Sequence, residues 1–123
     1  IYGDGKQIRD FTFIEDVVMA NLLSAGAADI ACGKSYNVGA GATTSVNDLA
    51  ARIGEITGRE WSPQHLPARE GDARASFANV EAIKKNVGFE PSYDLTMGLS
   101  KLASVLVYSS SLVKFFVIDS QSI

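Results

Sequence analysis

Apolar residues recur at helical spacing in several stretches of the chain, and the first two stretches are bounded by residues that favour helix ends. The first predicted helix begins at Asp16 and runs from Val17 to about Ala28. Its apolar face is wide, which predicts a well-buried helix. The second begins at Ser45, which together with Asp48 resembles a capping box, and it ends at Gly58.

Two further helices are predicted in the second half of the chain. Asn79 caps a short helix that continues through Val87, and Gly88 stops it. Asp94 caps the last helix, which carries leucines at helical spacing along one side: Leu95, Leu99, Leu102 and Leu106.

Strand patterns lie between these helices. We expect a hairpin at the start of the chain with Gly3-Asp4-Gly5 at its tip, and its return strand places Phe11 and Phe13 on one face. A second short strand over residues 34–38 leads into the glycine loop 39–41. Strands that alternate with helices predict an α/β arrangement, in one domain or part of one.

Two stretches fit neither pattern. Residues from Trp61 to Phe77 include two prolines and are expected to be irregular or extended. The run from Val105 to Ile118 is rich in β-branched and aromatic residues, but it holds a lysine and serines and is shorter than the roughly 20 apolar residues of a membrane span. We therefore expect no membrane role, and we expect this tail to pack against a part of the protein outside the chain. The first residue is Ile1, and we treat the chain as incomplete.

The composition narrows the classes of function. The 123 residues carry a formal net charge of −3, with 46% hydrophobic and 20% charged residues. An acidic chain argues against binding to nucleic acid, because the phosphate backbone requires many clustered cations. Cys32 is the only cysteine, so no internal disulfide can form, and a reducing cytoplasm fits best.

The candidate chemistry rests on two isolated arginines. Arg9 follows a glycine-punctuated turn, and Arg69 lies in an irregular loop with Gly71 and Asp72. A planar guanidinium binds phosphate oxygens through two parallel hydrogen bonds, which lysine cannot do. Glycine allows a ligand close to the backbone, and a carboxylate accepts hydrogen bonds from the two hydroxyls of a ribose. Together these residues predict a site for a nucleotide with two phosphates, although each arginine alone could equally form a surface ion pair.

Three other signals are set aside. Tyr2 and Lys6 have the Tyr-x-x-x-Lys spacing of a catalytic pair, but that pair requires a helix, and the intervening glycines predict a turn. The loop 39–41 lies between a strand and a helix, as in a dinucleotide-binding loop, but Thr44 takes the place of the third glycine. His65, the only histidine, has no candidate nucleophile or metal partner near it in sequence. We assign none of them a role.

Several segments occur in the order found in one enzyme family. They are Gly3 to Phe11, Tyr36 to Gly39, Ser45 to Leu49, Arg69 to Ser76, and Gly88 to Pro91. Over residues 1 to about 103, the chain resembles the C-terminal part of an extended short-chain dehydrogenase/reductase. More specifically, it looks like an NAD-dependent nucleotide-sugar epimerase/dehydratase, and it is most similar to the UDP-N-acetylglucosamine 4-epimerase group.

The resemblance implies a fold and a chemistry. The fold class is α/β: the C-terminal substrate-binding part of an NAD(P)-binding Rossmann-type enzyme, without the N-terminal Rossmann core. Such enzymes hold NAD on the N-terminal domain, where the tyrosine of a Tyr-x-x-x-Lys helix removes the sugar 4-OH proton while hydride passes to NAD. Residues 1–103 would form the substrate-binding part, with no catalytic or NAD-binding residue, and residues 104–123 an atypical apolar tail. The parent protein is expected to be a cytoplasmic homodimer.

The resemblance also assigns roles to single residues. Arg9 and Arg69 would contact the diphosphate of a UDP-sugar, and Asp72 would contact its ribose. Ser76 falls where the family sets the size of the hexose pocket, and a small residue there resembles forms that accept N-acetyl sugars. Dehydratases, decarboxylases and reductases of the same family share this binding half. A non-catalytic relative that binds NAD or a nucleotide sugar for regulation is a further alternative.

Overall fold

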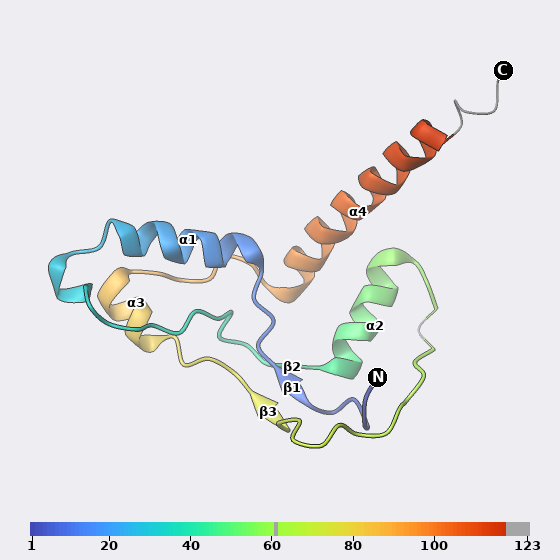
Figure 1. The fold of residues 1–123 in the computed structure, drawn as a ribbon, viewed down its shortest axis with the longest axis horizontal. Helices are drawn as coiled ribbons and strands as arrows, with labels where there is room; N and C mark the ends of the chain where they lie inside the picture. Colours follow the sequence, from blue (N-terminus) through green and yellow to red (C-terminus); the bar gives the residue numbers. More distant parts are fainter. Residues whose placement is uncertain (61, 118–123) are drawn as a thin grey trace.

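The computed structural model describes residues 1–60 and 62–117, with the side chains of residues up to 106. Trp61, in the stretch expected to be irregular, and residues 118–123, the last part of the predicted tail, lie outside the described residues. The chain alternates short strands with helices, as expected (Figure 1). In chain order the elements are β1 (Ile8–Arg9), α1 (Ile14–Ala25), the 3₁₀ helix η1 (Asp29–Ala31), β2 (Thr44–Ser45), α2 (Val46–Thr57), β3 (Ala75–Ser76), α3 (Glu81–Val87) and α4 (Leu95–Val117).

The three strands form one small sheet in the order β2-β1-β3. The central strand β1 pairs antiparallel with β2 and parallel with β3, so Arg9 lies opposite Ser76. The predicted hairpin is therefore wrong, because both partners of β1 come from distant parts of the sequence. Tyr2 forms a parallel bridge with Leu66 instead. The turn at residues 3–5 bends the chain so that the segments before and after it join different neighbours.

The second helix, α2, begins and ends as the sequence predicts. Ser45 Oγ accepts a hydrogen bond from the backbone N–H of Asp48 at 3.0 Å and donates to the Asp48 carboxylate at 2.7 Å. Gly58 follows the last helical residue in the left-handed conformation. This start places Val46 directly after β2, where its N–H donates to the carbonyl of Gln7 at 3.2 Å.

The predicted cap of α4 is present, whereas α3 begins one residue later than predicted, because Val80 and not Asn79 directly precedes it. Asn79 Oδ1 accepts from the N–H of Glu81 at 3.0 Å, and α3 ends before Gly88. Asp94 Oδ1 accepts from a backbone N–H in the first turn of α4 at 2.8 Å. The helix α4 then continues to Val117 and projects away from the other elements (Figure 1). It runs through residue 103, and the division of the chain there stays a prediction.

The first helix, α1, begins earlier than predicted, at Ile14, and ends earlier, at Ala25. Asp16 does not cap it but lies in its first turn with 2% of its surface exposed. Its carboxylate accepts hydrogen bonds from the backbone N–H groups of Ser92 at 2.9 Å and Tyr93 at 3.2 Å. An aspartate before an apolar run favours a cap in sequence, but here it ties α1 to the segment that leads into α4.

The described core is small and lies between α1 and α3. Ala20, Ile83 and Phe89 are each 1% exposed, and Tyr36 and Val38 pack against them. The predicted strand over residues 34–38 is wrong, since this segment belongs to no sheet. A strand requires a neighbour to bond its backbone N–H and C=O groups, and no described residue pairs with this segment.

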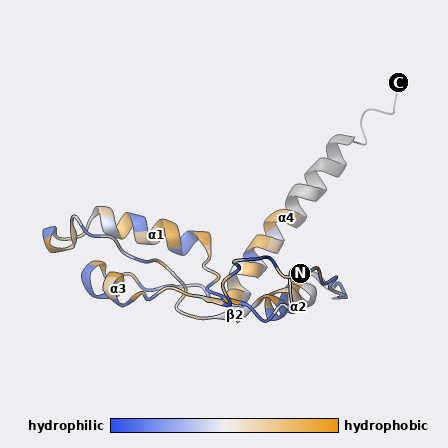
Figure 2. Ribbon diagram, turned by 60° about the horizontal axis from the view of Figure 1, so that its bottom comes forward, coloured by the Kyte–Doolittle hydropathy of each residue, from blue (hydrophilic) through white to orange (hydrophobic). Residues whose placement is uncertain are grey.

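Much of the apolar surface is uncovered, so the prediction of a well-buried first helix is also wrong for this chain. Apolar residues lie along α1 and along the first turns of α4 (Figure 2). Ile14 and Leu22 are 64% and 63% exposed on α1, and Leu102 and Leu106 are 51% and 61% exposed on α4. Within residues 1–60 and 62–117, no helix is long and apolar enough to span a lipid bilayer.

Candidate functional site

Arg9 and Asp72 form an ion pair beside the sheet. Arg9 is the last residue of β1, and Asp72 lies in the loop that leads to β3. Arg9 Nη2 donates to Asp72 Oδ1 at 2.5 Å, and Arg9 Nη1 donates to the carbonyl of Ile8 at 2.8 Å. The two charged side chains are 26% and 38% exposed. The pair is therefore partly solvated and accessible to a ligand.

The guanidinium of Arg69 lies over the ring of Tyr2. Its guanidinium carbon is 3.7 Å from the ring centroid, which is a close cation–π contact. The parallel bridge fixes the backbone of Tyr2, because Gly3 N–H donates to the Leu66 carbonyl at 2.9 Å and Leu66 N–H donates to the Ile1 carbonyl at 2.8 Å. Among the residues with described side chains, no carboxylate lies within ion-pair distance of Arg69.

An open cavity of about 470 Å³ lies beside Arg69 and Asp72. A second cavity, of about 340 Å³, borders the same two residues. Volumes of this order are typical of small-molecule sites. Three separate segments of the chain supply the lining of the larger cavity, which includes Tyr2, Gln7, Val46, Arg69, Gly71 and Asp72. Arg69 and Asp72 thus line the cavity, as the sequence predicts, and Arg9 is joined to it through Asp72.

Reasoning from the sequence assigned three of the lining residues no role at this site. Tyr2 contributes an aromatic face, Val46 an apolar face, and Gln7 an amide whose Nε2 donates to the Tyr2 carbonyl at 3.0 Å. They reach the cavity through the β1–β2 pairing and the bridge to Leu66. No local pattern marks such residues. The register of β1 against β2, once known, would have placed Val46 beside Gln7.

Ser76 lies next to this group along the sheet. It stands opposite Arg9 in the parallel pair, and its carbonyl accepts from the N–H of Asp10 at 3.2 Å. It is exposed and does not line either of the two cavities beside Arg69. The structure therefore brings Ser76 close to Arg9 but leaves it outside those cavities.

A second arginine–carboxylate pair holds the turn at the edge of the smaller cavity. Arg74 Nη1 and Nη2 donate to the two carboxylate oxygens of Asp4 at 2.7 and 3.0 Å. This bidentate bond, together with a bond from the Lys6 N–H, lowers the pKa of Asp4 to about 2. Asn47 Nδ2 donates to the Asp4 carbonyl at 3.0 Å and holds the same turn from α2.

The Tyr-x-x-x-Lys spacing near the start of the chain is a coincidence of sequence. Gly3 and Gly5 have φ angles of 70° and 69°, so Tyr2 and Lys6 are separated by a turn and do not share a helix face. His65 contacts the same turn, with its Nδ1 2.7 Å from the carbonyl oxygen of Gly3.

The glycine loop 39–41 binds an internal carboxylate. The N–H groups of Ala40 and Gly41 donate to the side chain of Asp10 at 2.8 and 3.3 Å. A Cβ atom at Gly39 would lie 2.5 Å from Asp10 Oδ2 and 2.7 Å from the Cβ of Ala78. Glycine is required at position 39 because Asp10 approaches the backbone there, and the loop is occupied by this contact.

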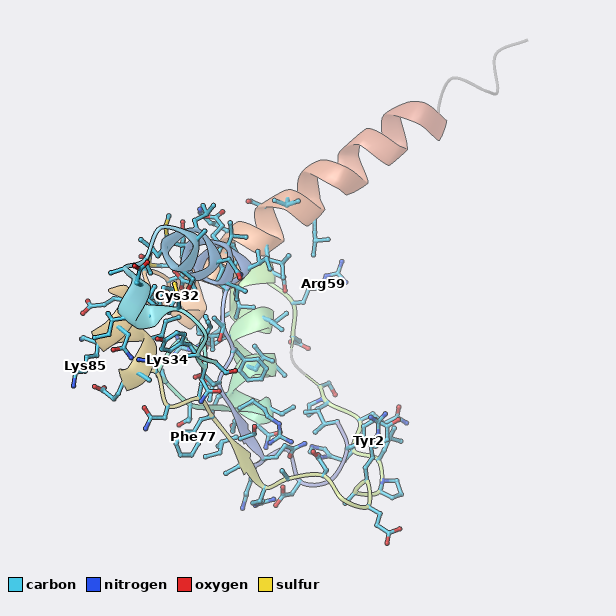
Figure 3. The ribbon with its side chains drawn as sticks, turned by 60° about the vertical axis from the view of Figure 1, so that its left-hand side comes forward. Tyr2, Cys32, Lys34, Arg59, Phe77 and Lys85 are labelled. Carbon is cyan, nitrogen blue, oxygen red and sulfur yellow. The ribbon has the colours of Figure 1, made fainter. Side chains whose placement is uncertain are left out.

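Metal chemistry has no support in the described part of the chain. No group of histidine, cysteine, aspartate and glutamate side chains there is arranged to hold a metal ion. The exposed free thiol of Cys32 lies at the other end of the fold from Tyr2 (Figure 3). It is not part of the cavity that Tyr2 lines.

Comparison with known proteins gives consistent matches. The family described as GDP-mannose 4,6 dehydratase matches residues 1–102. The UDP-glucose 4-epimerase of Mycolicibacterium smegmatis is 35% identical over 101 residues, which cover 82% of this chain and 32% of that protein. The UDP-glucose 4-epimerase of Thermotoga maritima, solved with UDP-glucose, is 37% identical and superposes with a TM-score of 0.79. The match covers 91% of this chain and 35% of that protein. The UDP-glucuronic acid 4-epimerase of Bacillus cereus, solved with UDP-glucuronic acid and NAD, has a TM-score of 0.75 at 25% identity, over 80% of this chain and 32% of that one.

This chain spans about a third of the length of these relatives. The matched region includes Arg9, Arg69, Asp72 and Ser76. The relatives confirm the fold class expected from the sequence, an α/β part of a Rossmann-type enzyme, and NAD occurs as the bound cofactor in the family. The chain belongs to the nucleotide-sugar epimerase/dehydratase family of extended short-chain dehydrogenases/reductases.

Proposed function

We propose that this chain is the UDP-sugar-binding part of an NAD-dependent 4-epimerase that acts on a UDP-hexose such as UDP-glucose or UDP-N-acetylglucosamine. The observation that carries the proposal is that Arg69 and Asp72 line one cavity and that Arg9, 63 residues from Asp72 in sequence, bonds to Asp72. The relatives named as UDP-sugar 4-epimerases support the reaction class.

The proposed binding mode follows from the charges. Arg69 presents a guanidinium that no carboxylate neutralises within the described side chains, so it attracts the diphosphate first. Arg9 then exchanges Asp72 for phosphate oxygens, and Asp72 accepts hydrogen bonds from the ribose hydroxyls. The ion pair between Arg9 and Asp72 is thus replaced by hydrogen bonds from Arg9 to phosphate and from the ribose to Asp72. Both are charge-assisted and therefore stronger than neutral hydrogen bonds. A ligand without phosphates that drew Asp72 to its ribose would leave Arg9 without a partner, at a cost in free energy.

Ser76 is proposed to border the hexose. Its position opposite Arg9 supports this role, because a sugar attached to the diphosphate must lie close to the arginine that holds the phosphate. A serine at this position leaves more space than a large side chain would. We therefore include N-acetylated hexoses among the substrates.

The described part of the chain supplies no loop that fits the diphosphate of NAD. The segment most similar to a dinucleotide loop is 39–41, and its N–H groups already bind the carboxylate of Asp10. We therefore assign the NAD site and the catalytic Tyr-x-x-x-Lys pair to the part of the parent protein outside this chain. We propose a cytoplasmic homodimer, in which the uncovered apolar residues of α1 and α4 support contact with further protein.

The test is an assay of the full-length parent protein with NAD and either UDP-glucose or UDP-N-acetylglucosamine. We expect the 4-epimer to form, and we expect the 123-residue chain alone to leave both sugars unchanged. An epimer produced by the isolated chain would contradict the placement of the chemistry. Release of water would indicate a dehydratase, and release of carbon dioxide from UDP-glucuronic acid a decarboxylase. Binding of a UDP-sugar without any turnover would favour the regulatory alternative.

A further inference from the structure

The loop 67–73 carries two residues of the proposed site, Arg69 and Asp72, and holds no helix or strand. It begins after Leu66, whose N–H and carbonyl bond to the backbone at the start of the chain. Among the described side chains, the Arg9–Asp72 ion pair is the only one that joins this loop to another segment. In the proposed binding mode Arg9 exchanges Asp72 for phosphate, so the loop loses this connection when the ligand binds.

A different ion pair holds the other end of the loop. Arg74 directly follows the loop and donates from Nη1 and Nη2 to the two carboxylate oxygens of Asp4, at 2.7 and 3.0 Å. The carbonyl of Arg74 accepts from the N–H of Ile8 at 3.0 Å. Neither contact involves Arg9 or Asp72, so both contacts persist when a ligand binds to those two residues.

Asp4 is itself fixed against α2. Asn47, in the first turn of that helix, donates from Nδ2 to the Asp4 carbonyl at 3.0 Å and from its N–H to the Gly5 carbonyl at 3.0 Å. Gly5 has a φ of 69°, and a Cβ atom there would overlap the side chain of Asn47, so the turn packs closely on the helix. The carboxylate that holds Arg74 is therefore held in turn by α2.

We propose that Asp4 and Arg74 are positioning residues for binding of the UDP-sugar: their bidentate pair keeps the loop 67–73 beside the cavity while Arg9 and Asp72 exchange partners. This inference rests on the proposed function. The side chains of Arg74 and Asp4 are 65% and 49% exposed. Because exposed ion pairs are weak, loss of this pair should reduce the population of the binding-competent loop by no more than about fivefold.

A direct contact between Arg74 and the ligand is the alternative, since Arg74 and Asp4 both line the smaller cavity. The two interpretations predict opposite effects of Asp4→Ala. This substitution removes a negative charge near the diphosphate and releases the guanidinium of Arg74, so a direct contact predicts tighter binding of UDP. Positioning predicts weaker binding, because the loop loses its attachment to the turn.

The experiment measures the dissociation constants of UDP and of NAD by calorimetry on the full-length protein. The variants are Asp4→Ala, Arg74→Ala and the double substitution. Glu90→Ala is the matched control, because it also removes one negative charge and breaks an exposed pair, Lys84–Glu90, whose residues line neither cavity. Thermal unfolding of each variant checks that the fold is retained.

We expect each single substitution in the pair to raise the Kd for UDP about two- to fivefold, and the double substitution to raise it no further than either alone. The Kd for NAD and the Glu90→Ala variant should match the parent. Unchanged or tighter binding by Asp4→Ala would overturn the inference while the proposed function stands. Additive losses would also overturn it, because Asp4 and Arg74 would then act separately, and so would an equal loss of NAD affinity, which indicates general damage to the fold. A parent protein that does not bind UDP at all would instead refute the proposed function.

Discussion

Arg9 donates a hydrogen bond of 2.5 Å to Asp72, which lies 63 residues away in sequence. Both residues are predicted to bind the same ligand. Their side chains are 26% and 38% exposed. Solvent screens an ion pair at this depth, so such a pair contributes only about 0.2–1 kcal/mol to stability. The pair therefore suits binding, in which each member exchanges the other for a group of the ligand, better than it suits stabilisation of the fold.

Replacement of Asp72 should separate these two roles. We expect Asp72→Asn to change the free energy of unfolding by less than about 1 kcal/mol and to weaken UDP binding by about 1.5–3 kcal/mol. Urea unfolding and calorimetric titration with UDP measure the two quantities. Glu90→Gln is the control, because it breaks the exposed Lys84–Glu90 pair, whose residues do not line the cavities. A loss of stability as large as the loss of binding would assign Asp72 to the fold.

Substitution of Ser76 tests the proposed hexose pocket. An aromatic ring at this position should fill the space of an acetamido group, because a packed site tolerates little extra volume. We expect Ser76→Tyr to lower kcat/KM for UDP-N-acetylglucosamine much more than for UDP-glucose. Ala75→Tyr is the matched control, since successive residues of a strand point to opposite faces. Equal losses on both substrates would indicate damage to the fold, and unchanged values would place Ser76 outside the pocket.

The bond between Asp4 and Arg74 predicts a pH dependence of stability. The hydrogen bonds from Arg74 and from the Lys6 N–H lower the pKa of Asp4 from 3.8 to about 2 in the folded protein. The unfolded chain therefore takes up a proton first as the pH falls, so the stabilising effect is complete above about pH 3.8 and is lost as the pH falls through about 2. Asp4→Asn should have a lower Tm than the parent at neutral pH, and the difference should shrink across this interval. A difference that does not vary with pH would contradict the assignment.

Gly39 should tolerate no side chain. We expect Gly39→Ala to lower the free energy of unfolding by about 1–3 kcal/mol, because its Cβ would overlap the carboxylate of Asp10 and the side chain of Ala78. Chemical unfolding measures the change. Gly26→Ala serves as the control, since the nearest atom to a Cβ there is 3.9 Å away and its φ is −99°. Similar effects at both positions would show that the close approach of Asp10 is unimportant.

The sequence predicts the local features of this fold well. Ser45, Gly58, Gly88 and Asp94 end or begin helices where expected, because a cap is a contact between residues only a few positions apart. The α/β class is also as expected, although the predicted strand over residues 34–38 is absent and β2 was not predicted. These signals require no knowledge of distant parts of the chain.

The errors concern contacts that are distant in sequence. Tyr2 pairs with Leu66 and not with a strand next to it in sequence. Asp16 does not cap its own helix but accepts a hydrogen bond from the N–H of Ser92. Residues 34–38 have the composition of a strand but no neighbour in the described chain to pair with. At the site, Arg69 and Asp72 were predicted from their chemistry, whereas the stacking of Tyr2 under Arg69 depends on the bridge to Leu66 and has no local signal.

The most direct test of the account is calorimetric titration of the full-length protein with a UDP-sugar, for the parent and for Arg9→Ala, Arg69→Ala and Arg69→Lys. We predict that each alanine substitution weakens binding by about 1.5–3 kcal/mol, the range for a charge-assisted hydrogen bond, while the affinity for NAD stays nearly unchanged. Arg69→Lys should restore only part of the loss, because an ammonium group lacks the planar fork. If both alanine variants bind the UDP-sugar as tightly as the parent, Arg9 and Arg69 are ordinary surface residues and the proposed site is wrong.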